Sequence, residues 1–201
     1  MAIPTIEKFR IPLSRLFAIA LLSLILLSDS KWEGTIVTVI LFASGCFLVA
    51  IASLGRLWCN LYIGGYKTEA VITEGPYSMC RHPLYFFSFL GAIGVALATE
   101  TMLIPLAVFL GFAIYYPYTM RSEEADLLKR YHDAYAVYRD STPAFFPKPS
   151  LLREPVNYTV YTRVFRKHIF DALWFIWLVG IMEIIEAFHE LGILPIIFHL
   201  Y

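Results

Sequence analysis

Two short polar segments contain the residues of this chain that are best suited to chemistry. The first holds Arg81 and His82, and the second holds Arg121, Glu123 and Glu124. Guanidinium and imidazole groups bind anions, whereas carboxylates accept hydrogen bonds from the hydroxyl and amino groups of a ligand. Together these residue types predict a binding or catalytic site, provided that the fold brings the two segments into contact.

Two apolar stretches, 83–98 and 102–118, separate the polar segments, and only Thr99, Glu100 and Thr101 connect them. A connection this short favours an antiparallel helical hairpin. A hairpin that crosses a membrane and returns would place both polar segments at the same membrane face. Ionisable residues grouped at such a boundary are costly to desolvate, so they indicate a functional site.

Small residues and prolines predict how the hairpin packs. Gly91 and Gly94 on its first helix, with Ala107 and Gly111 on its second, predict a close approach of the two backbones. Two prolines in the second helix, at positions 105 and 117, predict that it is bent or locally broken.

The composition identifies an integral membrane protein. Hydrophobic residues make up 59% of the 201 residues and charged residues only 16%, whereas soluble domains have about 25% charged residues. A helix needs about 20 apolar residues to cross the hydrocarbon core. We therefore expect an all-α, polytopic membrane protein with about five transmembrane helices, at residues 16–28, 34–54, 83–98, 102–118 and 169–188.

The basic residues predict the orientation of this bundle. If the N-terminus is cytoplasmic, Lys31 is the only one of the 16 Lys and Arg residues in an outside segment. Because basic residues near span ends are retained on the cytoplasmic side, both polar segments are predicted to face the cytoplasm. We expect one membrane domain over residues 1–201, made of two N-terminal spans (1–55), a loop, hairpin and amphipathic helix (56–148), and a juxtamembrane segment with the last span (149–201).

Helix signals refine the region around the polar segments. Pro83 suits the first position of a helix, which places His82 near its N-cap, where anionic groups are favoured. Beyond the second hairpin helix, apolar residues recur at helical spacing between charged ones, which predicts a cytoplasmic amphipathic helix. These residues are Leu127, Tyr131, Ala134, Tyr135 and Tyr138.

The chain resembles the isoprenylcysteine carboxyl methyltransferase and phospholipid methyltransferase superfamily over about residues 68–148. The motifs are Gly75-Pro76-Tyr77, Arg81-His82-Pro83-Leu84-Tyr85, Arg121-x-Glu123-Glu124-x-x-Leu127 and Tyr135-x-x-Tyr138. The resemblance implies an integral membrane enzyme that uses S-adenosylmethionine, with the Arg-His-Pro and Glu-Glu segments framing the cofactor pocket near the cytoplasmic face. Where family members commonly have a Phe-Gly pair, this chain has Tyr131-His132.

The resemblance suggests roles for the motif residues. Glu123 and Glu124 suit the ribose hydroxyls or the amino group of the cofactor, and aromatic faces suit a sulfonium cation. Arg81 or Arg121 could pair with an acceptor carboxylate, and His82 could donate a hydrogen bond to the same group. The predicted catalytic residues are Arg81, His82 and Arg121. The predicted cofactor-binding residues are Tyr77, His82, Pro83, Tyr85, Glu123, Glu124, Tyr135 and Tyr138.

The expected partners are membrane lipid and a lipophilic or prenylated methyl acceptor. An isoprenylcysteine-type carboxylate is the first candidate, and a phospholipid amine or a small hydrophobic thiol are the alternatives. An anionic acceptor favours direct contact with an arginine, whereas an amine needs a base. The net charge of zero gives no reason to expect a nucleic-acid partner.

Two other classes of function stay open. One is a membrane reductase that uses a nicotinamide cofactor, and the other is a non-enzymatic protein that handles a metal or haem. The second would depend on Glu183, Glu186 and His189, whose spacing resembles carboxylate-bridged metal sites in helical bundles. Such sites need carboxylates from other helices, and no other predicted span has one in its interior, so we expect no metal site. The last span either helps to form an acceptor tunnel or only closes the bundle.

Overall fold

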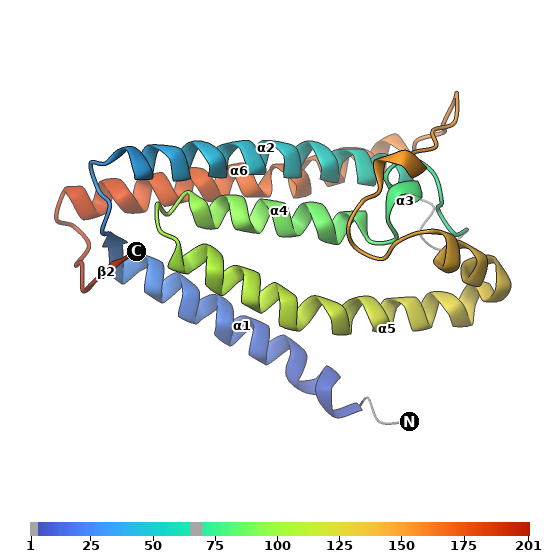
Figure 1. The fold of residues 1–201 in the computed structure, drawn as a ribbon, viewed down its shortest axis with the longest axis horizontal. Coiled ribbons are helices and arrows are strands. Elements are labelled where there is room, and N and C mark those ends of the chain that lie inside the picture. Colours follow the sequence, from blue (N-terminus) through green and yellow to red (C-terminus); the bar gives the residue numbers. More distant parts are fainter. Residues whose placement is uncertain (1–3, 65–69) are drawn as a thin grey trace.

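The computed structural model of the protein describes residues 4–64 and 70–201 (Figure 1). Its helices are α1 (Pro4–Leu27), α2 (Ile36–Ile63), α3 (Pro76–Met79), α4 (Pro83–Leu97), α5 (Leu103–Ser141) and α6 (Thr162–Glu190), with a 3-10 turn at Pro149–Leu151. The described residues contain only two short strands, β1 (Ser28–Ser30) and β2 (Phe198–Leu200), which pair in parallel. The predicted all-α class is therefore confirmed.

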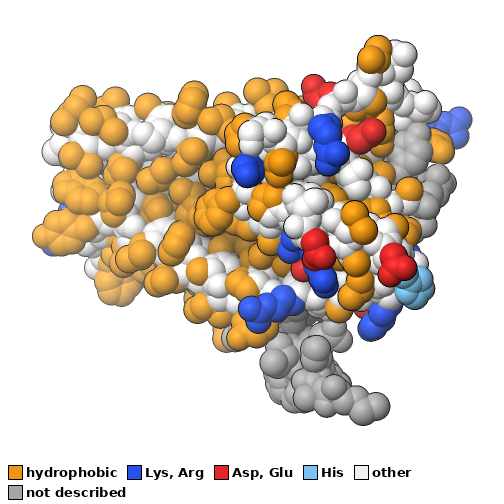
Figure 2. Space-filling view, turned by 45° about the vertical axis from the view of Figure 1, so that its right-hand side comes forward, with side chains coloured by type: hydrophobic (Ala, Val, Ile, Leu, Met, Phe, Trp, Pro, Cys, Tyr) orange, Lys and Arg blue, Asp and Glu red, His pale blue; other side chains and the backbone are white. Residues whose placement is uncertain are grey.

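Three helices, α2, α5 and α6, are long and apolar enough to cross a membrane. Two further apolar helices, Ser14–Leu27 and Pro83–Leu97, are shorter; at 1.5 Å per residue, the second is only about 22 Å long. All five predicted spans lie on these helices, but the number that cross the bilayer stays a prediction. Figure 2 shows hydrophobic side chains covering one end of the molecule and charged side chains gathered at the other.

The close packing predicted within the hairpin occurs with other partners. Gly94 of α4 faces Gly45 of α2, where a Cβ added to Gly45 would lie 2.5 Å from the carbonyl oxygen of Gly94. Gly91 instead faces Phe175 of α6, and Gly111 of α5 faces Phe17 of α1. The predicted approach of Gly91 and Gly94 to Ala107 and Gly111 is therefore wrong. The face of α4 that contains Gly94 packs against α2. The second hairpin helix, α5, lies on another side of α4 and diverges from it (Figure 1).

We expect Gly45→Ala to destabilise the protein, because its Cβ would meet backbone that cannot move aside. Overpacking of this kind costs about 2 kcal/mol, which corresponds to a fall of about 5 °C in the thermal midpoint. The matched control is Gly180→Ala, since a Cβ at Gly180 has nothing within 4 Å, and Ala favours a helix by about 1 kcal/mol. Equal midpoints for the two detergent-purified variants would contradict the close α2–α4 contact.

The second hairpin helix, α5, continues from the apolar stretch into the amphipathic one and has a kink inside the latter. Its only non-helical backbone among the described residues is at His132, with φ 46° and ψ −122°, and helical geometry persists at Pro117. The local break in this helix therefore lies at His132 and not at Pro117. Glycine tolerates positive φ better than any other residue, which gives a physical reason for the Phe-Gly pair that the superfamily commonly has here.

Replacing His132 by glycine is therefore expected to stabilise the fold. A side chain held at such angles costs about 1–3 kcal/mol, and the extra flexibility of glycine in the unfolded chain offsets about 0.5–1 kcal/mol of the gain. We expect a thermal midpoint higher by about 3 °C. His132→Ala keeps a Cβ and serves as the control, because it should give no such rise.

The two strands close the end of the molecule that lies opposite α3. The backbone N–H groups of Met102 and Leu103, at the start of α5, both donate to the carbonyl oxygen of Tyr201, at 2.7 and 2.9 Å. The ammonium group of Lys31 lies 3.7 Å from the centre of the Tyr201 ring. These contacts of Tyr201 hold the start of α5 at this end of the molecule. The helix then runs toward the opposite end, where the charged side chains gather (Figure 1 and Figure 2).

Candidate functional site

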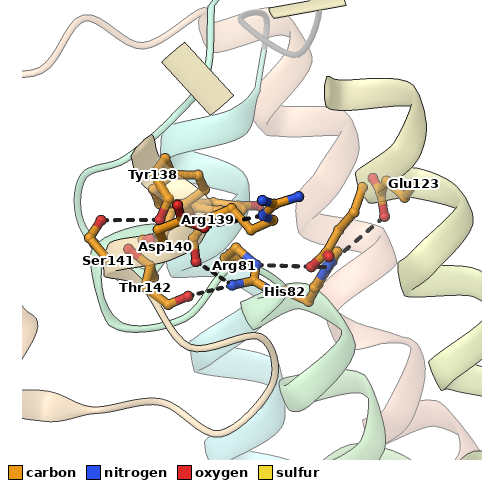
Figure 3. Close-up of polar contacts among 10 residues, drawn as sticks. Arg81, His82, Glu123, Tyr138, Arg139, Asp140, Ser141 and Thr142 are labelled. Carbon is orange, nitrogen blue, oxygen red and sulfur yellow. Dashed lines mark hydrogen bonds and ion pairs between the residues drawn. The ribbon is translucent and has the colours of Figure 1, made fainter. Parts of the chain in front are cut away.

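The structure brings the two polar segments together at the start of α4 (Figure 3). One oxygen of Glu124 lies 2.9 Å from Nε of Arg81 and 2.9 Å from Nε2 of His82. The other imidazole nitrogen of His82 lies 3.8 Å from a carboxylate oxygen of Glu123. The hairpin thus places an arginine, a histidine and two glutamates in one cluster.

Local backbone signals position the first segment. Gly75 precedes α3 with φ 58°, and a Cβ there would collide with the ring of Tyr62. Pro83 is the first residue of α4 and His82 is its N-cap, as the sequence predicted. The short helix α3 and the start of α4 therefore hold Arg81 and His82 between two turns with fixed backbone geometry.

The chain that follows α5 packs along this segment and satisfies its backbone. The N–H of Arg81 donates to the carbonyl of Pro143 at 2.8 Å, and the N–H of His82 donates to the carbonyl of Ala144 at 3.0 Å. These two bonds hold the backbone that leads into α4, and the side chain of His82 is only 4% exposed.

Arg81 is engaged in holding the site together. Besides its contact with Glu124, its Nη1 donates to the carbonyl oxygens of Arg139 and Thr142, at 2.7 and 2.6 Å. These carbonyls belong to the end of α5, where helical acceptors lack partners along the helix. The structure therefore uses this guanidinium to join α4 to α5, which counts against the predicted pairing of Arg81 with an acceptor carboxylate.

The two glutamates differ in their surroundings. The Glu124 side chain is 19% exposed and the Glu123 side chain is 35% exposed. Burial by itself raises the pKa of the Glu124 carboxyl, but the hydrogen bonds from His82 and Arg81 outweigh it and hold that pKa below its ordinary value. Glu124 is thus an ionised structural partner of the cluster, while Glu123 has room to contact a ligand.

Beside the cluster lies a cavity of about 600 Å³, within the range of small-molecule sites. Its lining includes seven of the predicted site residues, namely Tyr77, Arg81, His82, Tyr85, Glu123, Tyr135 and Tyr138. Three others do not line it. Pro83 is fully buried at the start of α4, Glu124 lies against Arg81 and His82, and Arg121 is exposed on α5.

Sequence reasoning missed several lining residues. One face of α5 contributes Thr119, Ser122, Asp126, Leu127 and Arg130 besides Glu123. Their spacing of three and four residues is the signal that would have found them, because such positions share a helix face. The remaining wall comes from Ile63 and from residues 70–72, for which the sequence has no comparable signal.

Two tyrosine hydroxyls in the cavity wall lack partners. Those of Tyr77 and Tyr135 are buried and have no hydrogen bond among the described residues. Tyr138 differs, since its hydroxyl donates to the carbonyl oxygen of Tyr77 at 2.7 Å. Burial raises the pKa of Tyr77 well above its ordinary value and that of Tyr135 to about 12, so both phenols stay protonated. An unpaired buried hydroxyl costs about 1–3 kcal/mol, which a bound ligand can recover.

Comparison with known proteins agrees with the resemblance of the motifs. A sequence model of the family described as phospholipid methyltransferase matches residues 32–134, a range that contains α2, α4, most of α5 and both polar segments. The chain belongs to the phospholipid methyltransferase family. This places it in the superfamily that the motifs indicated.

Two curated relatives share almost the whole length of this phospholipid methyltransferase family member. One is the cobalt-zinc-cadmium resistance protein CzcN of Cupriavidus metallidurans, which is 38% identical over 94% of this chain and 87% of the relative. The other is the nickel-cobalt-cadmium resistance protein NccN of Alcaligenes xylosoxydans xylosoxydans, 36% identical over 94% of this chain and 89% of the relative. No solved structure matches the chain.

The family member also has a polar cluster at its other end. Glu186 and His189 of α6 line a small cavity of about 40 Å³ together with Asp29, Glu33 and Glu100. These three carboxylates lie between the predicted spans and not inside them. The Nε2 of His189 lies 3.0 Å from the carbonyl oxygen of Leu26. Within residues 4–64 and 70–201, no three metal-binding side chains are grouped closely enough to hold an ion.

Proposed function

We propose that this protein is an integral membrane methyltransferase that moves a methyl group from S-adenosylmethionine to a lipophilic acceptor. The observation that carries the proposal is the cavity beside His82 and Glu123, with its two unpaired tyrosine hydroxyls. We place this site on the cytoplasmic side, because the distribution of basic residues favours that orientation.

The residues of the cavity fit the proposed cofactor. Glu123 accepts hydrogen bonds from ribose hydroxyls or from an amino group, while the protonated hydroxyls of Tyr77 and Tyr135 donate to nitrogen or carboxylate acceptors. The aromatic face of Tyr85 suits a sulfonium cation. When bound, the cofactor supplies an electrophilic methyl group, and the protein has to align the acceptor with it and exclude water.

The arrangement also bears on the choice of acceptor. A carboxylate or thiolate acceptor is already an anion and needs no base, whereas an amine loses a proton to Glu123 or His82. An isoprenylcysteine-type carboxylate remains our first candidate, with a phospholipid amine or a small thiol as alternatives. Since Arg81 is engaged by Glu124 and by two carbonyls, an anionic acceptor needs another cation.

A transfer assay tests this function. The full chain in proteoliposomes is supplied with S-adenosylmethionine labelled in its methyl group, together with a prenylated cysteine, a phospholipid amine or an alkyl thiol in separate reactions. We expect label in the organic phase with one acceptor, and at least a tenfold loss with Glu124→Ala. If label never exceeds that of protein-free liposomes, the proposal fails, and the nicotinamide and metal alternatives take its place.

The names of the two relatives support a biological setting for the activity. Both are named as resistance proteins for cobalt, cadmium and a third metal, and we propose that methylation by this protein supports growth in such metals. A strain that lacks the protein should regain metal tolerance with the wild-type chain but not with Glu124→Ala. Full rescue by a variant with no methyl transfer would separate resistance from methylation.

A further inference from the structure

A second arginine lies inside the bundle without a carboxylate partner. Arg56 of α2 is partly buried, and its Nη1 donates to the hydroxyl of Ser88 on α4. Its guanidinium carbon lies 5.6 Å from the centre of the Phe175 ring of α6. Among the described residues Arg56 forms no ion pair, and its Nε is buried without an acceptor.

The alternative explanation is an arginine that only marks the cytoplasmic side of the membrane. Such a side chain extends along the helix surface and places its charge in the interfacial water. Arg56 instead contacts α4 through Ser88 and α6 through Phe175. Arginine cannot lose its proton in a protein, and a partly buried charge without a counter-ion is costly. The position therefore favours a bound anion.

Ser88 is arranged to support this charge. Its hydroxyl donates to the carbonyl oxygen of Leu84 at 2.6 Å, so a lone pair of the oxygen accepts from Arg56. Ser88 lies three residues after Tyr85, which lines the proposed cofactor cavity. Positions three apart share a helix face, so Ser88 lies on the same side of α4 as Tyr85 and about 5 Å farther from the start of that helix. The hydrogen bond to Ser88 places the Arg56 guanidinium at this level.

We propose that Arg56 and Ser88 bind the anionic group of the lipophilic acceptor, a membrane amphiphile, while its reactive end reaches the cavity beside Tyr85. This inference rests on the proposed function, and it supplies the cation that an anionic acceptor needs now that Arg81 is engaged and Arg121 is exposed. The acceptor is then an anionic lipid or lipid-like molecule rather than a neutral one.

Native mass spectrometry of the full chain, released from a neutral detergent, tests the proposal. The probes are phosphatidylglycerol, phosphatidylcholine and inorganic phosphate, each with and without S-adenosylhomocysteine. We expect one phosphatidylglycerol molecule per protein at a concentration at least fivefold lower than for phosphatidylcholine. We also expect a ternary complex with S-adenosylhomocysteine. Phosphate alone should not bind, and phosphate binding that depends on Arg56 would overturn the lipid assignment.

Variants assign the binding to this arginine. Arg56→Gln should abolish the preference for phosphatidylglycerol, and Ser88→Ala should weaken it two- to threefold. The matched control is Arg166→Gln, which removes an exposed charge from α6 and should keep the preference. Equal losses for the two arginine variants would show general surface attraction and overturn the proposal. If Arg56→Gln does not fold, Arg56→Lys retains the charge and should bind the lipid at least threefold more weakly.

The same spectra separate this inference from the proposed function. Arg56→Gln should bind S-adenosylhomocysteine as the wild type does, because Arg56 does not line that cavity. Wild-type protein that binds the lipid but never the nucleoside would refute the methyltransferase proposal while leaving the lipid site in place. If phosphatidylglycerol and S-adenosylhomocysteine exclude each other, the proposal that Arg56 and Ser88 hold the methyl acceptor is overturned.

Discussion

Replacing Glu124 by alanine is expected to lower the affinity for S-adenosylhomocysteine at least 30-fold and to destabilise the protein. One oxygen of this carboxylate contacts both Arg81 and His82 at 2.9 Å, so its loss frees two side chains of the cavity wall. It also leaves the guanidinium of Arg81, 13% exposed, without its counter-ion. Removing one partner of a buried pair costs about 3 kcal/mol, measurable as a lower thermal midpoint.

The pH dependence of the thermal midpoint is a second test of the stabilising role of the Glu124 carboxylate. Because its pKa is lowered in the folded protein, its contribution is fully present above the ordinary carboxyl pKa and disappears as the pH falls through the folded value. The midpoints of wild type and Glu124→Gln should therefore differ most at neutral pH and converge in acid. Glu123→Gln is the control, since Glu123 has no contact with Arg81; it should lose ligand affinity with little change in midpoint.

Tyr135→Phe is expected to change ligand affinity and stability in opposite directions. The Tyr135 side chain is only 1% exposed, and its hydroxyl has no partner among the described residues. Removing an unsatisfied buried hydroxyl should stabilise the ligand-free protein by about 1 kcal/mol. If that hydroxyl binds the cofactor, the same change should weaken S-adenosylhomocysteine about tenfold, because one hydrogen bond is lost.

Tyr138→Phe provides the matched comparison. Its hydroxyl already donates to the carbonyl of Tyr77, so its loss should destabilise the protein by about 1 kcal/mol. Thermal unfolding and calorimetry of the two variants separate a ligand-binding hydroxyl from a structural one. If Tyr135→Phe is both less stable and unchanged in affinity, the hydroxyl has a partner within the fold and no role in binding.

The sequence predicted the features that depend on local pattern. Pro83 marked the start of α4, apolar composition marked the membrane helices, and the three-residue connection predicted the hairpin that brings His82 to Glu124. These predictions succeed because proline geometry, hydrophobic length and loop length act within a few residues of the chain.

Features that depend on distant contacts were not predictable in the same way. Small residues indicate that two helices approach closely, but they do not indicate which helix is the partner. Gly94 of α4 packs against Gly45 of α2 and not against α5. Nothing in the sequence showed that Arg81 would be engaged by carbonyls of α5, nor that Glu123 and Glu124 would have different roles. The contacts of Arg56 were likewise not predictable, because Ser88 and Phe175 lie on two other helices.

The most direct test of the central claim is calorimetric titration of the detergent-purified protein with S-adenosylhomocysteine, for wild type and for Glu123→Ala/Glu124→Ala. The proposed pocket requires micromolar binding by the wild type and none by the folded double variant. Absence of binding by well-folded wild type, or equal binding by both proteins, would contradict a methyltransferase site at this cluster.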